Sequence, residues 1–95
     1  MSITTKKRAE LRALAAGEDT VVTVGKNGIT DSVITSCEEA FNTREIVKGK
    51  VLENSMVTPR EACDELCQKL HADPVQVIGT KFVIYRKNDK IRTKN

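Results

Sequence analysis

Residues 21–31 constrain this chain more than any other stretch, because they predict a strand, a loop and a helix start in immediate succession. The stretch opens with Val-Val-Thr-Val, and β-branched residues suit a half-buried strand. Gly25 and Gly28 then bracket a four-residue loop, where glycine permits a positive φ and leaves no Cβ in the way of an approaching ligand. Thr30 can cap the helix that follows, and Asp31 suits its positive end.

The same loop is a candidate phosphate site. Backbone N–H groups beside a helix N-terminus favour an anion, while Lys26 adds a positive charge and Asn27 offers donors and acceptors. These features predict a clamp on a nucleic-acid backbone, and an ordinary tight turn is the alternative. The loop is not a nucleotide-binding P-loop, because no Gly-Lys-Ser/Thr follows, and it lacks the third glycine of a dinucleotide-binding fingerprint.

Basic residues gather toward the two ends of the chain, whose net charge is +3. Residues 30–80 carry nine acids and five bases, whereas residues 81–95 carry six bases and one acid. This asymmetry predicts a nucleic-acid-binding face, and a solvated surface with a charged tail is the alternative. No apolar run reaches membrane-spanning length and no signal segment follows the first charges, so we expect a cytoplasmic protein without a membrane partner.

The hydrophobic periodicity predicts seven elements in the order α-β-α-β-α-β-β. They are a helix over 5–16, a strand over 20–24, a helix over 31–42, a strand over 45–52, a helix over 59–71, and strands over 75–78 and 81–86. Thr58, Pro59 and Glu61 form a strong helix start. Asp73-Pro74 is expected to break that helix, and Gly79-Thr80 to turn a hairpin.

These elements predict an α/β fold, in which one small mixed four-stranded sheet carries three helices mainly on one face. We expect residues 1–86 to form a single domain and residues 87–95 to form a basic flexible tail. The first helix should bury Leu11, Leu14 and Ala15. Gly49 is unusual inside a strand, where it predicts weak packing or a bulge.

The three cysteines are Cys37, Cys63 and Cys67, and they fall on predicted apolar helix faces, which favours burial in the core. Their odd number and the missing Cys-x-x-Cys argue against a disulfide framework. His71 follows Cys63 by eight residues, or ~12 Å along a helix, so we expect no metal site there. A thiol-based redox function is an alternative that requires an exposed Cys63 with a depressed pKa.

Catalysis is not expected, because His71 is the only histidine and no carboxylate cluster or nucleophile–base set is evident. We therefore predict no enzyme activity, no cofactor and no small-molecule substrate. The only aromatic residues are Phe41, Phe82 and Tyr85. Phe41 is expected in the core and the other two on opposite faces of one strand, which disfavours an aromatic base-stacking platform. Recognition of RNA backbone and shape is the better prediction.

The chain resembles the CRM domain family, and in particular its stand-alone bacterial YhbY-like members, over about residues 4–86. The resemblance rests on Arg-Ala-Leu-Ala at 12–15, Val-Gly-Lys-Asn-Gly-Ile-Thr at 24–30, Glu-Ile-Val-Lys-Gly-Lys-Val at 45–51, Val-Gln-Val-Ile-Gly at 75–79 and Phe-Val-Ile-Tyr-Arg at 82–86. Gly49 departs from the family pattern, which usually has a β-branched residue there.

This resemblance implies an RNA-binding domain with a fold like the C-terminal domain of translation initiation factor 3. It also implies association with ribosomal RNA or precursors of the large subunit during ribosome assembly. The expected RNA contacts are the loop residues Gly25, Lys26, Asn27 and Gly28 and the basic residues Arg8, Arg12, Lys48 and Lys50. The alternative is a protein-interaction or regulatory domain of the same fold that makes no direct RNA contact.

Overall fold

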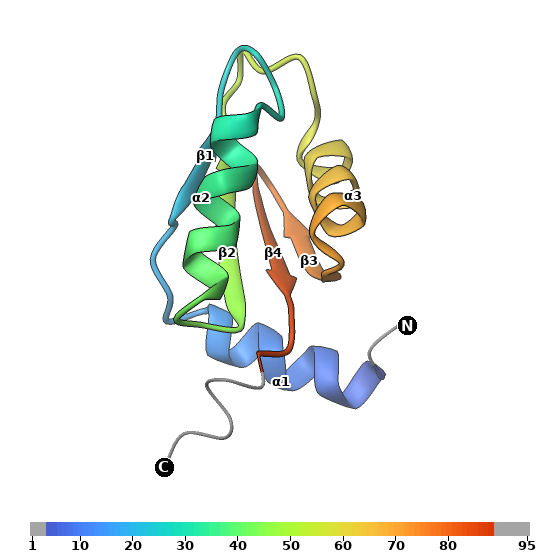
Figure 1. The fold of residues 1–95 in the computed structure, drawn as a ribbon. Coiled ribbons are helices and arrows are strands. Elements are labelled where there is room, and N and C mark those ends of the chain that lie inside the picture. The colour runs from blue at the N-terminus through green and yellow to red at the C-terminus, as the bar shows by residue number, and fades with distance from the viewer. Residues whose placement is uncertain (1–3, 89–95) are drawn as a thin grey trace.

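The computed structural model describes residues 4–88 and has three layers (Figure 1). Helices α2 and α3 cover one face of a four-stranded sheet, and α1 covers the lower part of the other face. The elements are α1 (Thr5–Ala15), β1 (Val22–Val24), α2 (Asp31–Phe41), β2 (Ile46–Val51), α3 (Pro59–Leu70), β3 (Asp73–Ile78) and β4 (Lys81–Tyr85). The predicted α/β class, element order and mixed sheet are confirmed.

The strands lie in the order β1-β2-β4-β3. Strands β1 and β2 are parallel and are connected through α2, whereas β4 is antiparallel to both of its neighbours. The predicted Gly79-Thr80 turn joins β3 to β4, and Gly79 adopts the positive φ (58°) that such a turn requires. This order leaves β1 and β3 at the two edges of the sheet.

Each helix begins at a threonine cap. The hydroxyls of Thr4, Thr30 and Thr58 accept hydrogen bonds from backbone N–H groups three residues further on. At Thr58 the predicted capping box is complete, because Glu61 Oε1 accepts from the Thr58 amide at 2.9 Å. Such caps satisfy amides that have no partner within the helix.

The predicted end of α3 near His71 is confirmed, but the way in which the helix ends differs from the prediction. The helix ends through His71, which adopts a left-handed conformation (φ 56°), and not through a break at Asp73-Pro74. Strand β3 instead begins at Asp73 and includes Pro74, with a register shift between Pro74 and Gln76. An edge strand tolerates proline because its outer side donates no ladder hydrogen bond.

Two hydrophobic cores lie on opposite faces of the sheet. The larger one, under α2 and α3, contains Phe41, Leu66, Leu70, Phe82 and Ile84 among others. The smaller one packs Leu11 and Ala15 of α1 against Val75, Val83 and Tyr85. The prediction that Leu14 belongs to the buried stripe of α1 is wrong, because 62% of this residue is exposed.

The cysteines are buried in the larger core, as predicted. Burial is the main reason why the pKa of the Cys37 thiol is raised to about 11. A hydrogen bond between the thiols of Cys63 and Cys67 raises the pKa of Cys67 and lowers that of Cys63. Cys63 nevertheless has no exposed surface, so the structure contradicts the exposed thiol that the redox alternative requires.

Gly49 has a packing reason that the sequence did not reveal. It lies directly opposite Phe82 in the β2–β4 ladder, and the Phe82 ring covers it. A Cβ built on Gly49 would lie 2.2 Å from Phe82 Cζ. The expected weak packing or bulge is therefore wrong, because the β2–β4 register runs unbroken through this residue and both residues are buried.

The chain beyond β4 is fastened to the domain. Arg86 donates to the Leu70 carbonyl at 3.1 Å and to Glu38 Oε1 at 2.9 Å, and its guanidinium lies 4.6 Å from the centre of the Phe41 ring. The backbone N–H of Asn88, a residue predicted to belong to the tail, donates a hydrogen bond to Glu45 Oε2 at 2.6 Å. Residues 89–95 of the expected tail lie outside the described residues. Over residues 4–88, no helix has the length and apolar character needed to cross a membrane.

Candidate nucleic-acid interface

The Gly25–Gly28 loop lies at the end of the sheet opposite α1 (Figure 1). The amide of Gly28 donates to the carbonyl of Gly25 at 3.0 Å, which closes the turn, and Gly28 has a φ of 72°. Lys26 and Asn27 are exposed at the tip. The strand–loop–helix succession predicted from the sequence is confirmed.

Several backbone amides around this loop are available to a ligand. Those of Lys26 and Asn27 in the loop, and of Asp31 and Ser32 in the first turn of α2, make no hydrogen bond within residues 4–88. Amides of this kind, next to the positive end of a helix dipole, suit an anion. The Asp31 carboxylate adds one negative charge at the helix start, which leaves Lys26 as the local cation.

A second basic surface lies on the α1 face of the sheet, which we call the sheet groove. It is about 120 Å³ and is lined by Arg12, Ala15, Ala16, Lys48, Gln76, Ile78, Lys81 and Val83. Lys50 lies beside it, directly opposite Lys81 in the β2–β4 ladder. Directly opposed residues have Cβ atoms ~5 Å apart, so two like charges meet here on an exposed strand pair.

Lys48 has a structural role in addition to its charge. Its Nζ lies 3.4 Å from the carbonyl oxygens of both Ala15 and Glu18, so it donates to the C-terminal end of α1 and the turn that follows. A cation at this position is favourable because helix C-termini carry partial negative charge. The predicted RNA contacts Lys48 and Lys50 are therefore not equivalent: Lys48 holds α1, and Lys50 is exposed.

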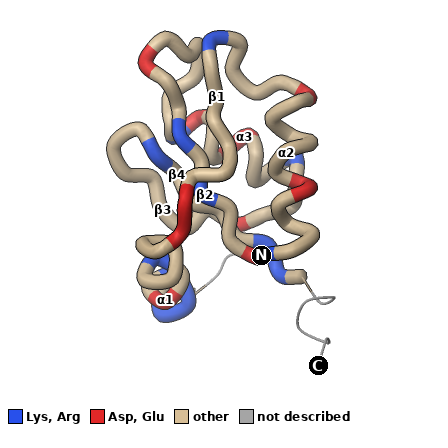
Figure 2. The backbone as a smooth tube through the Cα atoms, turned by 90° about the vertical axis from the view of Figure 1, so that its left-hand side faces the viewer, with Lys and Arg blue, Asp and Glu red and all other residues tan. Residues whose placement is uncertain are grey.

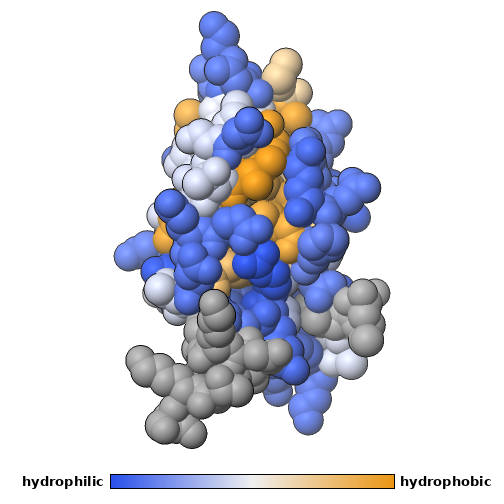
Figure 3. Space-filling model, viewed as in Figure 1, coloured by the Kyte–Doolittle hydropathy of each residue, from blue (hydrophilic) through white to orange (hydrophobic). Residues whose placement is uncertain are grey.

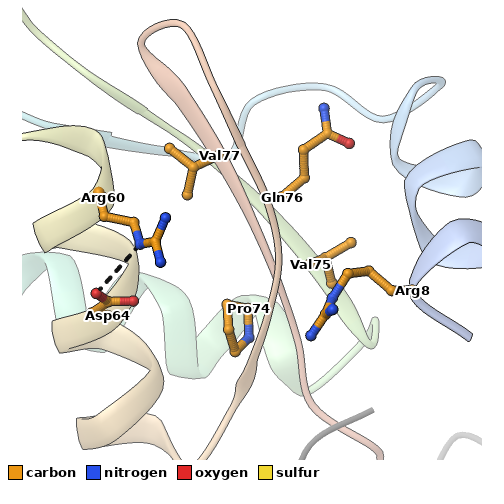
Figure 4. A pocket seen from close by; sticks show the side chains of 7 residues that line it. All are labelled: Arg8, Arg60, Asp64, Pro74, Val75, Gln76 and Val77. Carbon is orange, nitrogen blue, oxygen red and sulfur yellow. Dashed lines mark ion pairs between the residues drawn. The ribbon is translucent and has the colours of Figure 1, made fainter. Parts of the chain in front are cut away.

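Arg8 is separated from the sheet groove and lies at the open edge of β3 (Figure 4). There it lines a pocket of about 320 Å³ together with Arg60 of α3, which pairs with Asp64 at 3.7 Å. Gln76 lines both this pocket and the sheet groove. The two basic regions are thus neighbours, on the two sides of β3.

The structure therefore brings Arg12 and Lys48 together in the sheet groove and places Lys50 beside them, whereas the Gly25–Gly28 loop lies at the far end of the sheet. Figure 2 shows basic positions along the α1 face of the molecule, from the loop at the top to α1 at the bottom. Lys50 pairs with Thr23 of β1, two residues before Gly25, and so lies between the two regions.

Sequence reasoning missed Lys81, which completes the sheet groove. Part of the position of Lys81 could be predicted, because the Gly79-Thr80 turn fixes Ile78 as its hairpin partner. The pairing of Lys81 with Lys50 on the other side of β4 could not be predicted from the turn.

The prediction for the aromatic residues is confirmed: Phe82 and Tyr85 lie on opposite faces of the sheet, and both are buried. Within residues 4–88, no group of three or more histidines, cysteines or acids could hold a metal ion.

The fold thus combines a strand–Gly-x-x-Gly–helix unit with a small mixed sheet and a separate basic groove. The family model of the CRS1/YhbY (CRM) domain matches residues 3–86. The chain belongs to this family.

Named relatives span nearly the whole chain. The "Probable RNA-binding protein PA4753" of Pseudomonas aeruginosa is 32% identical over 90 residues, which cover 95% of this chain and 86% of that protein. An RNA-binding protein of Haemophilus influenzae is 31% identical over 91 residues, covering 96% and 92%. The solution structure of the hypothetical protein SAV1595 from Staphylococcus aureus superimposes with a TM-score of 0.78 at 34% identity and 90% coverage of both chains.

Proposed function

We propose that this protein binds ribosomal RNA within precursors of the large ribosomal subunit. In this proposal the Gly25–Gly28 loop holds the RNA backbone, and the sheet groove with Lys50 supplies a second basic contact. The observation that carries the proposal is the loop itself, where unpaired amides, an exposed lysine and a helix N-terminus meet at one exposed end of the sheet.

The charges on the α1 face support the same function. Arg12, Lys50 and Lys81 make no ion pair within residues 4–88, so their charges are available to phosphates. Lysine and arginine at such positions bind phosphate without reading sequence, and each contact releases counterions. The relatives' names, one a probable RNA-binding protein and one an RNA-binding protein, agree with this chemistry.

Salt-dependent RNA affinity tests the proposal. Lys26→Ala should weaken binding about equally for RNAs of different sequence and reduce the salt slope by roughly one unit or less, as expected for one phosphate contact. Gly28→Asp should weaken binding further, because it adds a negative charge to the loop, at a position where the new side chain is directed toward Met56 and Val57. Gly28→Ala is the matched control, since it introduces the same backbone strain at a positive φ without the charge.

If folded Gly28→Asp and Lys26→Ala bind RNA as tightly as the parent, the loop is an ordinary turn and the RNA site is elsewhere. The ribosomal part is tested separately, by crosslinking the full chain to RNA in cells and sequencing what is attached. Enrichment of large-subunit ribosomal RNA supports the proposal, and its absence refutes that part. If no RNA is retained at low salt, the protein-interaction alternative replaces RNA binding altogether.

A further inference from the structure

The segment 52–58, between β2 and α3, lies against the Gly25–Gly28 loop at the top of the molecule (Figure 1). Leu52 Cδ1 is 3.9 Å from the position that a Cβ would take at Gly25, and Met56 Cγ is 3.1 Å from the corresponding position at Gly28. Each glycine of the loop is therefore backed by an apolar side chain of the neighbouring segment.

These two side chains are also exposed to solvent, to 39% for Leu52 and 74% for Met56. On the α2–α3 side, Val57 is partly buried against the larger core. Figure 3 shows an apolar surface that runs between α2 and α3 up toward this end, next to the hydrophilic tip. A contiguous exposed apolar patch that is rimmed by polar residues marks an interaction site.

A pocket of about 260 Å³ opens at this segment, and we call it the Met56 pocket. It is lined by Val51, Leu52, Glu53, Ser55, Met56, Val57, Thr58, Pro59 and Thr80. The hydroxyls of Ser55 and Thr58 already accept backbone hydrogen bonds. The side chains of Glu53 and Thr80 make no hydrogen bond or ion pair within residues 4–88, so they are available to an occupant.

The chemistry of the Met56 pocket selects its occupant. No lysine or arginine lines it, and the Glu53 carboxylate repels a phosphate group. Mostly apolar walls with a few polar groups suit a flat, uncharged ring system. A carboxylate can also accept a hydrogen bond from the exocyclic amino group of a base, as it does from cytosine in DNA complexes.

We propose that the Met56 pocket takes one unpaired nucleobase of the RNA strand whose backbone lies on the Gly25–Gly28 loop. The proposal rests on the proposed RNA-binding function and specifies the RNA element that this end of the protein selects. Bases inside a duplex are paired and stacked, so only a base in a loop, a bulge or a single-stranded end can enter. Met56 suits this role because its thioether chain is flexible and polarisable.

The test uses the full chain with 13C-labelled methionine methyl groups. It is titrated with a ten-nucleotide single-stranded oligocytidine and with a fully paired RNA duplex carrying the same number of phosphates. The Met56 methyl resonance should shift far more with the single strand than with the duplex, because the duplex contacts the adjacent loop but places no base in the pocket. Met56→Ala should weaken binding of the single strand roughly fivefold, as expected for the loss of a few tens of Å² of apolar contact, and leave duplex affinity unchanged.

Leu14→Ala is the matched control, because Leu14 is also exposed but lies on α1 at the other end of the sheet. It should leave both affinities unchanged. If salt-dependent RNA binding persists while the Met56 resonance stays fixed and Met56→Ala binds the single strand normally, the pocket proposal is wrong and the proposed function stands. If neither RNA binds at low salt, both proposals fail together.

Discussion

Gly49→Ala should destabilise this domain severely, although it adds only one methyl group. The new Cβ would lie 2.2 Å from Phe82 Cζ and 2.7 Å from both Cε atoms. Carbon atoms in contact are normally 3.5–4.0 Å apart, roughly the optimum of their attraction. Phe82 has no exposed surface and packs in the larger core, so its ring can move only if its neighbours also move.

Two effects of the substitution oppose each other. Replacing glycine by alanine removes conformational freedom from the unfolded chain, which stabilises a protein by about 0.4–1 kcal/mol where the native backbone permits it. Overpacking a core costs about 1–3 kcal/mol and occasionally more. Because the added atom overlaps three atoms of a buried ring, we expect the steric cost to win, with a net loss of ~2–3 kcal/mol.

A loss of that size lowers the melting temperature by roughly 10–20 °C in a domain of this length. Urea unfolding followed by circular dichroism measures it directly. Gly17→Ala is the control, because the nearest atom to its new Cβ is the Leu14 carbonyl oxygen at 3.9 Å. The Gly49→Ala loss should also shrink when Phe82→Leu is introduced beside it. A Gly49→Ala protein as stable as the parent would refute the packing argument.

Four further outcomes are expected. Cys37, Cys63 and Cys67 should react slowly with a thiol reagent in the native protein, and fast labelling without unfolding would contradict their burial. Burial raises the pKa of the Cys37 thiol to about 11. The neutral thiol therefore contributes stability below its ordinary pKa near 9, and this stability is lost as the pH rises toward 11. The difference in unfolding free energy between the parent and Cys37→Ala should narrow between pH 9 and pH 11. Lys48→Met should cost about 0.5–1.5 kcal/mol through its lost hydrogen bonds to the end of α1. In the same urea titration Lys50→Met should not destabilise the protein, because it removes the repulsion between Lys50 and Lys81. Truncation after Asn88 should leave the melting temperature unchanged but weaken RNA binding at low salt, because it removes basic residues. If RNA binding has the same salt dependence with and without residues 89–95, these basic residues do not contribute to it.

The sequence predicted the elements because their signals are local. Thr30 and Thr58 cap their helices through hydroxyl groups that act three residues away, and the Gly-Lys-Asn-Gly loop needs only its own glycines. The apolar face of α2, including Cys37 and Phe41, follows from helical spacing alone. These features depend on residues that are close in the sequence, so they could be predicted before the fold was known.

The errors arose where a residue's role depends on a partner far away in the chain. Gly49 is explained by Phe82, which is 33 positions later and opposite it in the sheet. Leu14 follows the same periodicity as Leu11 but extends past the edge of the small core that α1 covers. Pro74 fits a strand only because β3 is an edge strand. The positions of these residues depend on which strands are neighbours in the sheet, and hydrophobic periodicity does not predict that order.

Strand order also decides which charges can act together on one RNA. Because β4 lies next to β2, Lys81 meets Lys50, and the sheet groove forms on the face that α1 leaves partly open. Because β1 lies on the other side of β2, the Gly25–Gly28 loop continues from the strand next to Lys50. If one RNA occupies both regions, Lys26→Ala and Lys81→Ala should each reduce the salt slope, and the double variant should reduce it by the sum. If the two regions bind separate RNAs, a short oligonucleotide that saturates the loop should leave the effect of Lys81→Ala unchanged.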